Sequence, residues 1–458
     1  MAKKSSFTYV DLFAGCGGLS LGLESQGGDL LVAVERSDMA AETFFHNLVR
    51  PLASKDEWKK YVSQSTELQV AEGVLVKELR ALLDSKKAMK TIVDSEPDLV
   101  VGGPPCQGFS LAGRRNPEDI RNQLPWQFLE LVEKSKPKMV VIENVVGMRH
   151  KFSTDDEGDV FNQLQQALRE TKPGYVVQGV QVNALHYGAP QHRPRLMVIG
   201  LRQDIANKRK ITSTGSLWSS DFTDKLKGDV PSLAPRPTVD SSQIRTVGEA
   251  INDLQQKPKK TSKDTGFIKE MSPNYWGLKT SDVITNHVDR VHQEKTQSRF
   301  RLYQYLSSQG IDARIVGIPS EEPTNVEKKL IEERLGTAAL PAKAPDGSVL
   351  AKTKRELVEL ICELRTKKHS QRVLNWNQPA RTVVTIGDDY VHPFEPRTFT
   401  VRELARFQGF PNGFEFRAKE TTGGLNRRTD VPQYSQVGNA VSPFLARAVG
   451  VLVNSILN

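Results

Sequence analysis

Short apolar runs recur through the first 200 residues and alternate with longer polar stretches in which apolar residues follow a helical spacing. The runs are rich in β-branched residues and do not alternate with polar positions, which is typical of strands buried on both faces of a parallel sheet. Alternating strands and helices of this kind predict a doubly wound α/β sheet. We expect strands at residues 8–13, 30–34, 98–101, 139–142, 176–182 and 196–200, and helices at 19–26 and 124–134, with one or two covering helices within 52–96.

The pattern weakens after residue 201, where a boundary is expected. Residues 202–245 are rich in Ser, Thr, Asp, Lys and Pro and show little periodicity. Further on, charged amphipathic patterns predict helices at 325–335 and 352–366. A short helix is expected within 398–411, ended by Gly409 and Pro411, followed by an apolar helix at 444–457.

Composition narrows the class of protein. The chain has 458 residues and no apolar run near the roughly 18 residues of a membrane span. A polar start followed by an early glycine loop does not fit a signal peptide. The three cysteines are odd in number and far apart, so they predict neither a disulfide framework nor a metal site. We therefore expect a cytoplasmic, reducing setting and no membrane partner.

The net charge of +9 is unevenly distributed. Residues 1–200 carry 24 Lys and Arg against 25 Asp and Glu, whereas residues 201–370 carry 29 against 22 and residues 371–458 carry 10 against 7. A basic excess in the later part of the chain indicates a polyanionic partner bound there, although a solvated basic surface would give the same count.

Cys106 follows the strand expected at 98–101, on a stiff loop. Two glycines let the backbone turn after the strand, and Pro104 and Pro105 fix the φ angles just before the thiol. Open α/β sheets place their active sites just past the ends of strands. Two interpretations are open on this segment alone: Cys106 is a nucleophile, or it is a small buried hydrophobic residue.

A second strand end predicts a cofactor site. The strand at 8–13 opens into the glycine loop Gly15 to Gly18, and a helix follows, which is the usual cradle for a nucleotide-like group. The next strand ends in Glu35, 18 positions after Gly17. A carboxylate at about that distance suits ribose hydroxyls, so the spacing fits a nucleoside cofactor.

A rigid cysteine, a carboxylate and arginines at neighbouring strand ends suit nucleophilic addition to an electron-poor ring such as cytosine. The Cys106 thiolate would add to ring carbon-6 while Glu143, protonated because it is buried, neutralises the ring at nitrogen-3. Carbon-5 could then take a methyl group from a sulfonium donor. An ordinary thiol is only a few per cent ionised at pH 7, so Arg193 is expected to help activate it.

The order of these residues resembles the DNA (cytosine-5) methyltransferase family. The resemblance rests on seven segments in the family's order: Asp11-Leu-Phe-Ala-Gly-Cys-Gly-Gly-Leu19, Gly102-Gly-Pro-Pro-Cys-Gln-Gly-Phe-Ser110, Arg121-Asn-Gln-Leu124, Glu143-Asn-Val145, Gln191-His-Arg-Pro-Arg195, Thr400-Val-Arg-Glu-Leu-Ala-Arg-Phe-Gln-Gly-Phe-Pro411 and Gly438-Asn-Ala-Val441. These segments span the chain from end to end.

The resemblance implies S-adenosylmethionine as cofactor, Cys106 as nucleophile and Glu143 as the partner of ring nitrogen-3. Asn144 would hold the active-site loop, and Arg193 and Arg195 would lie near the flipped base and its backbone. The cofactor is expected near Phe13, Gly15, Gly17, Gly18, Leu19, Glu35, Leu124, Asn439 and Ala440, and DNA near Gln107, Ser110 and Arg121.

The resemblance also implies three parts: a catalytic and cofactor-binding domain with a Rossmann-like methyltransferase sheet at 1–200, a smaller, irregular target-recognition domain at 201–430, and a segment at 431–458 that returns to complete the catalytic domain. The implied partner is double-stranded DNA, which would keep the protein with the nucleoid. A restriction endonuclease acting on the same site would be a further partner, and a monomer is expected.

Two other functions stay open at this point. A related enzyme could methylate cytosine in transfer RNA, but the long basic segment at 201–370 favours duplex DNA, read through its grooves. A non-catalytic DNA-binding regulator is the other alternative, and the intact Cys106 and Glu143 argue against it. One family feature is missing: the Asp of a Gly-Asp-Ile-like segment, which binds the adenine amino group, has no counterpart in Gly73-Val74-Leu75.

Overall fold

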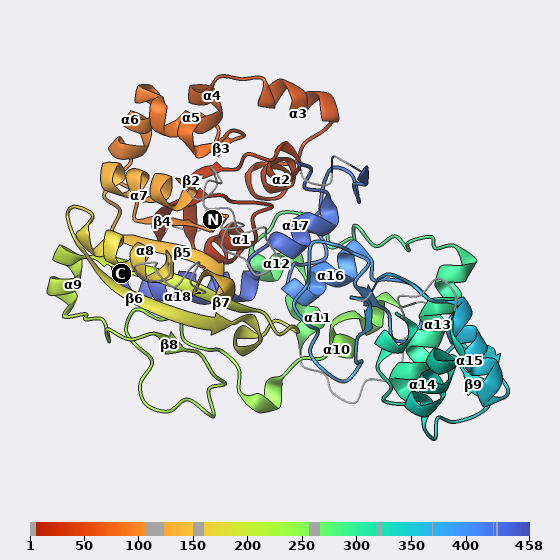
Figure 1. Cartoon of the computed structure of the whole chain (residues 1–458). Coiled ribbons are helices and arrows are strands. Elements are labelled where there is room, and N and C mark those ends of the chain that lie inside the picture. Colours follow the sequence, from red (N-terminus) through yellow and green to blue (C-terminus); the bar gives the residue numbers. More distant parts are fainter. Residues whose placement is uncertain are drawn as a thin grey trace.

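A single eight-stranded sheet organises the first half of the chain. The computed structural model describes residues 6–105, 123–149, 160–255, 266–317, 323–368 and 370–458 except 425, 427 and 428. The sheet order is β3-β2-β1-β4-β5-β7-β6-β8 (Figure 1). The strands are β1 (Phe7–Leu12), β2 (Gly28–Val34), β3 (Val74–Leu75), β4 (Leu99–Gly102), β5 (Met139–Val145), β6 (Tyr175–Asn183), β7 (Pro194–Arg202) and β8 (Trp218–Ser219).

The predicted doubly wound sheet is confirmed. Two features add to the prediction: the antiparallel strand β7 and the very short strands β3 and β8. The pairs that join β1 through β5 are parallel, whereas β7 runs antiparallel to both β5 and β6. The strands β3 and β8 have two residues each, which is too short to leave an apolar run in the sequence. The region 52–96 contains β3 and four short helices, whereas one or two helices were expected.

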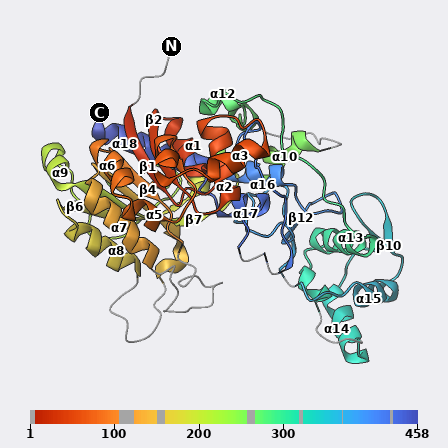
Figure 2. The same ribbon diagram turned by 90° about the horizontal axis from the view of Figure 1, so that it is seen from above.

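Helices cover both faces of the sheet (Figure 2). Successive residues of β1 show this: Tyr9 belongs to the hydrophobic cluster on the side of α1 (Gly18–Glu24), and Val10 belongs to the cluster on the side of α7 (Leu124–Ser135). Burial on both faces explains the absence of alternation in the strands. The other helices of this half are α2 (Asp38–Phe44), α3 (Lys55–Val62), α4 (Thr66–Ala71), α5 (Leu79–Asp84), α6 (Lys86–Asp94), α8 (Val160–Glu170) and α9 (Gln203–Arg209).

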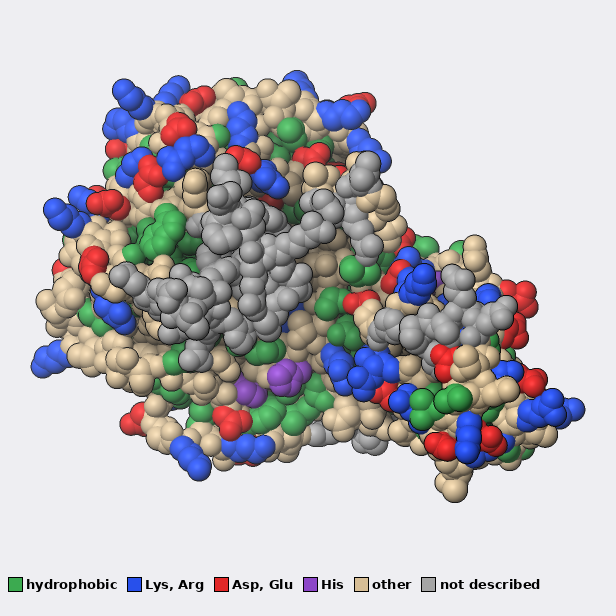
Figure 3. All heavy atoms as spheres, viewed as in Figure 1, with side chains coloured by type: hydrophobic (Ala, Val, Ile, Leu, Met, Phe, Trp, Pro, Cys, Tyr) green, Lys and Arg blue, Asp and Glu red, His purple; other side chains and the backbone are tan. Residues whose placement is uncertain are grey.

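Much of the later part of the chain is irregular, with helices set between long connecting segments, and it extends away from the sheet (Figures 1 and 2). Its outermost helices, α13 (Glu294–Ser308), α14 (Asn325–Leu335) and α15 (Lys354–Glu363), share a hydrophobic cluster of their own. On the face shown in Figure 3, a compact group of Lys and Arg side chains lies between these helices and the sheet. The remaining elements are α10 (Val247–Ile251), α11 (Phe267–Glu270), α12 (Pro273–Trp276), α16 (Val401–Gln408), α17 (Gln433–Asn439), α18 (Pro443–Leu457), β9 (Ala342–Lys343), β10 (Val349–Ala351), β11 (Arg372–Val373) and β12 (Tyr390–Val391).

Helix α16 joins the two parts of the chain. It begins with a capping box, in which Thr400 Oγ1 accepts from the Glu403 amide and Glu403 Oε2 accepts from the Thr400 amide. All of its side chains are buried, and Gly409 ends it as predicted. Two arginines of α16 are fully buried and bind groups outside the helix. Arg402 donates to the carbonyl of Pro411, and Arg406 pairs with Asp253.

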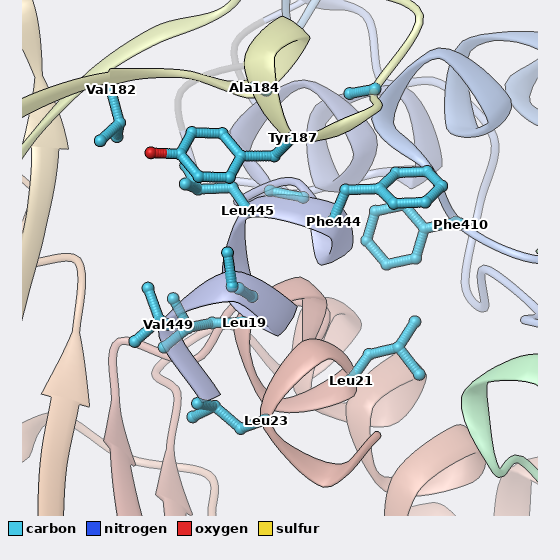
Figure 4. Close-up of a cluster of buried hydrophobic side chains, with 14 of the residues drawn as sticks. Leu19, Leu21, Leu23, Val182, Ala184, Tyr187, Phe410, Phe444, Leu445 and Val449 are labelled. Atoms are coloured by element: carbon cyan, nitrogen blue, oxygen red, sulfur yellow. The ribbon is translucent and has the colours of Figure 1, made fainter. Parts of the chain in front are cut away.

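The last helix of the chain packs against the first. Gly22 of α1 permits this approach, because a Cβ there would lie 2.5 Å from the backbone nitrogen of Arg447 in α18. Figure 4 shows Leu19 and Leu23 of α1 on the side of Val449 of α18, with Leu21 directed away from it. Among the described residues no single helix is long and apolar enough to cross a membrane, although the bent pair α17 and α18 passes on length and composition alone.

Candidate active site

The carboxyl ends of β1, β2, β4 and β5 open onto a cavity of about 650 Å³. This is the edge at which an open α/β sheet binds its ligands. Most of the described residues predicted for the site line the cavity together: Phe13, Gly15, Gly18, Leu19, Glu35, Leu124, Glu143, Asn144, Arg195, Asn439 and Ala440. Segments from both ends of the chain therefore contribute to one site.

The loop that carries the predicted nucleophile reaches this cavity. Cys106, Gln107, Ser110 and Arg121 lie outside the described residues. The residues just before them, Gly103, Pro104 and Pro105, line the cavity, and Asn144 Nδ2 donates to the carbonyl of Pro104 at 2.9 Å. The contact fixes the backbone two residues before Cys106 to the end of β5.

Glu143 and Arg195 form a nearly buried ion pair. Arg195 Nε lies 2.8 Å from Glu143 Oε1, and each side chain is only about 10% exposed. The antiparallel register of β5 and β7 brings them together, since Val145 pairs with Arg195. The guanidinium fixes the direction of the carboxyl group. Gly103 permits the close passage of the loop, because a Cβ there would lie 2.9 Å from Glu143 Oε2.

Glu35 ties the glycine loop to the end of β2. Its Oε2 accepts from the Gly15 amide at 2.9 Å, and its Oε1 accepts from the Ser37 amide at 2.7 Å. Burial raises the pKa of Glu35, and the two backbone amides oppose that shift. A carboxylate accepts about four hydrogen bonds, so Glu35 keeps capacity for a ligand in the cavity that it lines.

Two predicted residues take structural positions beside the cavity instead of lining it. Gly17 precedes α1 with φ 95°, and a Cβ there would lie 2.5 Å from Leu48 Cδ1. Arg193 is 1% exposed, and its guanidinium donates to the carbonyls of Val383, Gly438 and Ala440 at 2.7–3.0 Å. Arg193 thereby holds the segment that bears Asn439 and Ala440, and burial lowers its pKa.

Comparison with known proteins decides the family. A sequence model described as C-5 cytosine-specific DNA methylase matches residues 7–453. The chain belongs to this family. It is 27% identical to the type II methyltransferase M.DdeI of Desulfomicrobium norvegicum, over 96% of this chain and 86% of that protein. It is 28% identical to M.AgeI of Thalassovita gelatinovora, over 96% and 97% of the two chains.

A solved structure supports the fold of the methylase. A DNA modification methyltransferase encoded in an Escherichia coli prophage superposes with a TM-score of 0.57 at 20% identity, covering 99% of both chains. The chain is thus a DNA (cytosine-5) methyltransferase with a Rossmann-like sheet, and its methyl donor is S-adenosylmethionine.

The residues around the cavity fit this cofactor. A volume of about 650 Å³ lies in the range of sites for ligands of this size. A Cβ on Gly18 would collide with the backbone oxygen of Val441, so the glycine loop and the 439–441 segment close on each other as two walls of the methylase site. The acceptors of Glu35 would suit the ribose hydroxyls of such a cofactor.

Several residues that line the methylase cavity were not predicted from the sequence. Among them are Asp11, Arg36, Lys77, Glu78, Leu79, Thr429 and Asp430. Glu78 follows β3 and forms an ion pair with Arg36, with 3.3 Å between Oε1 and Nη1. The Asp that the resemblance implies for adenine binding is missing from Gly73-Val74-Leu75, in which Val74 and Leu75 form the two-residue strand β3 and Gly73 precedes it. Glu78 could have been identified as an acidic residue just after a strand. The strand β3, however, is too short to be recognised in the sequence.

Proposed function

We propose that this methylase methylates carbon-5 of a cytosine that is flipped out of duplex DNA, through a covalent adduct between Cys106 and ring carbon-6. The observation that carries the proposal is the shared cavity. Glu143, Arg195 and the start of the Cys106 loop face the same space as the glycine loop and Glu35. A base that enters this space would meet the nucleophile's loop and the cofactor's walls together.

The proposed reaction balances without a further reactant. The Cys106 thiolate adds to carbon-6, and the electron pair of the 5,6 double bond moves toward carbon-5 and the nitrogen-3 edge of the ring. S-adenosylmethionine supplies an electrophilic methyl group. Carbon-5 takes the methyl group, and the sulfonium leaves as the thioether S-adenosylhomocysteine. The carbon-5 proton is then lost to solvent, and the returning electron pair expels the thiolate.

Glu143 and Asn144 have separate roles in this proposal. Glu143 contacts ring nitrogen-3, and Arg195 fixes its direction through the 2.8 Å pair. Asn144 is a positioning residue, because it holds the Cys106 loop through the Pro104 carbonyl.

The proposed substrate is double-stranded DNA. The basic excess of residues 201–370 and the group of Lys and Arg side chains between the sheet and α13–α15 support a polyanion there. We propose residues 201–430 as the target-recognition part, with Gln107, Ser110 and Arg121 also at the DNA. The relatives M.DdeI and M.AgeI are named type II methyltransferases, which supports a role in restriction and modification beside a cognate endonuclease.

A trapping experiment tests the mechanism. Duplex DNA with 5-fluorocytosine at the target should stay covalently attached to the protein, because fluorine cannot leave as the proton does. Cys106→Ser should lose both trapping and methyl transfer while it still binds S-adenosylhomocysteine. Cys362→Ser is the matched control, since Cys362 lies in α15 away from the cavity, and it should trap normally. Turnover by Cys106→Ser would overturn the proposal, and methylation of transfer RNA in preference to DNA would overturn the substrate.

A further inference from the structure

Gln127 of α7 presents an unused hydrogen-bonding atom at the cavity. It lies three residues after Leu124, one turn further along the helix, and both residues line the cavity. The Oε1 atom of Gln127 is buried, and no described residue donates a hydrogen bond to it. Buried polar atoms of folded proteins nearly always have a hydrogen-bond partner. This oxygen is therefore suited to a donor that arrives with a ligand.

The packing of α7 places Gln127 beside the loop that follows β3. This loop leads into α5, and α5 packs against α7. Arg80 of α5 pairs with Glu130 of α7, with 2.9 Å between Nη2 and Oε2. Glu130 lies three residues after Gln127, so the two share one face of the helix. The loop residues Lys77 and Glu78 line the cavity together with Gln127, and the loop and the glutamine therefore border the same part of it.

The side chains of the loop after β3 offer no buried acceptor among residues 76–78. Lys77 has donors only, and its Nζ donates to Thr66 Oγ1 at 3.0 Å. The side chain of Glu78 is 65% exposed and pairs with Arg36. The Asp that the family resemblance implies for the adenine amino group is missing from this region. An acceptor for that amino group therefore has to come from another element.

We propose that Gln127 takes the place of the missing Asp and that its Oε1 accepts a hydrogen bond from the adenine amino group of S-adenosylmethionine. The contact is independent of the Cys106 adduct, since it concerns only the purine ring. Adenine presents its amino donor beside a ring-nitrogen acceptor. A carboxamide presents an acceptor beside a donor, which is how Asn and Gln pair with adenine in DNA. The apolar side chains of Leu79 and Leu124, which line the same cavity, suit the faces of the ring.

Calorimetry on the full chain tests the contact with two ligands. One is S-adenosylhomocysteine, and the other is its 6-deamino analogue, in which hydrogen replaces the amino group of the purine. The wild-type protein should bind the analogue about 10- to 100-fold more weakly, because the buried oxygen of Gln127 then has no donor. Gln127→Met has no acceptor and should bind the two ligands within about threefold of each other. Gln127→Glu keeps an acceptor and should keep a preference for the amino form.

Two further variants separate Gln127 from its neighbours. Glu78→Met removes the other acceptor near β3 and should keep the wild-type ratio of the two affinities. Gln166→Met is the matched control, since Gln166 is exposed on α8 and does not line the cavity, and it should bind both ligands as the wild type does. Equal binding of the two ligands by the wild-type protein, or a wild-type ratio in Gln127→Met, would overturn the contact. Loss of the ratio in Glu78→Met would assign the amino group to Glu78 instead. Failure of the wild-type protein to bind S-adenosylhomocysteine at all would overturn the cofactor itself.

Discussion

Replacing Arg193 by methionine distinguishes a structural role from a catalytic one. The sequence suggested that this guanidinium activates the thiol, whereas its three described hydrogen bonds go to backbone carbonyls. Methionine keeps most of the side-chain length and removes every donor. The substitution leaves three buried acceptors, each of which costs about 1–3 kcal/mol when unpaired.

The expected loss of stability is about 3–5 kcal/mol. The summed cost of three unpaired carbonyls would be larger, but removal of the fully buried charge of Arg193 offsets part of it. A buried charge is unfavourable because it loses its hydration, and for the same reason burial lowers the pKa of Arg193. Affinity for S-adenosylhomocysteine should fall as well, because the carbonyls of Gly438 and Ala440 flank the cavity wall at Asn439. A loss of this size is a large fraction of the 5–15 kcal/mol typical of a folded domain.

Urea unfolding followed by fluorescence measures the change. Arg355→Met is the control, since Arg355 is exposed on α15 and its ion pair among the described residues is with Glu359, and it should change stability by less than about 0.5 kcal/mol. The reasoning would be refuted if Arg193→Met unfolded at the wild-type urea concentration and bound S-adenosylhomocysteine normally but transferred no methyl group. That result would place Arg193 at the reacting base.

Three further predictions concern the rest of the cavity and its support. Gly22→Ala should destabilise the protein by about 1–3 kcal/mol in urea, since its Cβ would meet α18, and a wild-type midpoint would argue against the close packing. Glu78→Gln should weaken S-adenosylhomocysteine about 3- to 10-fold by calorimetry, with stability unchanged, because its carboxylate lines the cavity; equal affinity would exclude it from the binding site. Burial raises the pKa of Glu24 to about 8, so the folded state holds a proton that the unfolded state has lost, and stability should decline as pH rises from about 5 to 8. Urea midpoints at pH 6 and 8.5 should show this decline in the wild-type protein and a flatter profile in Glu24→Gln.

The long strands could be predicted because burial on both faces leaves an uninterrupted apolar run. The strand β3 has two residues and left no such run, so Glu78 beyond it was missed. The helix α13 was missed for a different reason. Its second half is buried from Leu302 to Leu306 at consecutive positions, which removes the amphipathic period that marks a surface helix.

Site residues could likewise be predicted where their position depends on neighbouring sequence, but not where it depends on distant segments. Glu35 and Glu143 were found because each ends a predicted strand. The direction of Arg193 was not accessible, since its acceptors lie 190, 245 and 247 residues further along the chain. A motif identifies which residue types are present, whereas contacts over such separations decide which way a side chain points.

The construction of the cavity from both ends of the chain has a consequence for synthesis. Thr43 and Gln436, whose side chains are joined by a hydrogen bond beside the cavity, are 393 residues apart in the sequence. A ribosome makes the glycine loop long before the wall at 439–441. A nascent chain therefore carries the loop before Cys106 well before the cavity beside it is complete. The cavity therefore lacks one of its described walls until the 439–441 segment has been made.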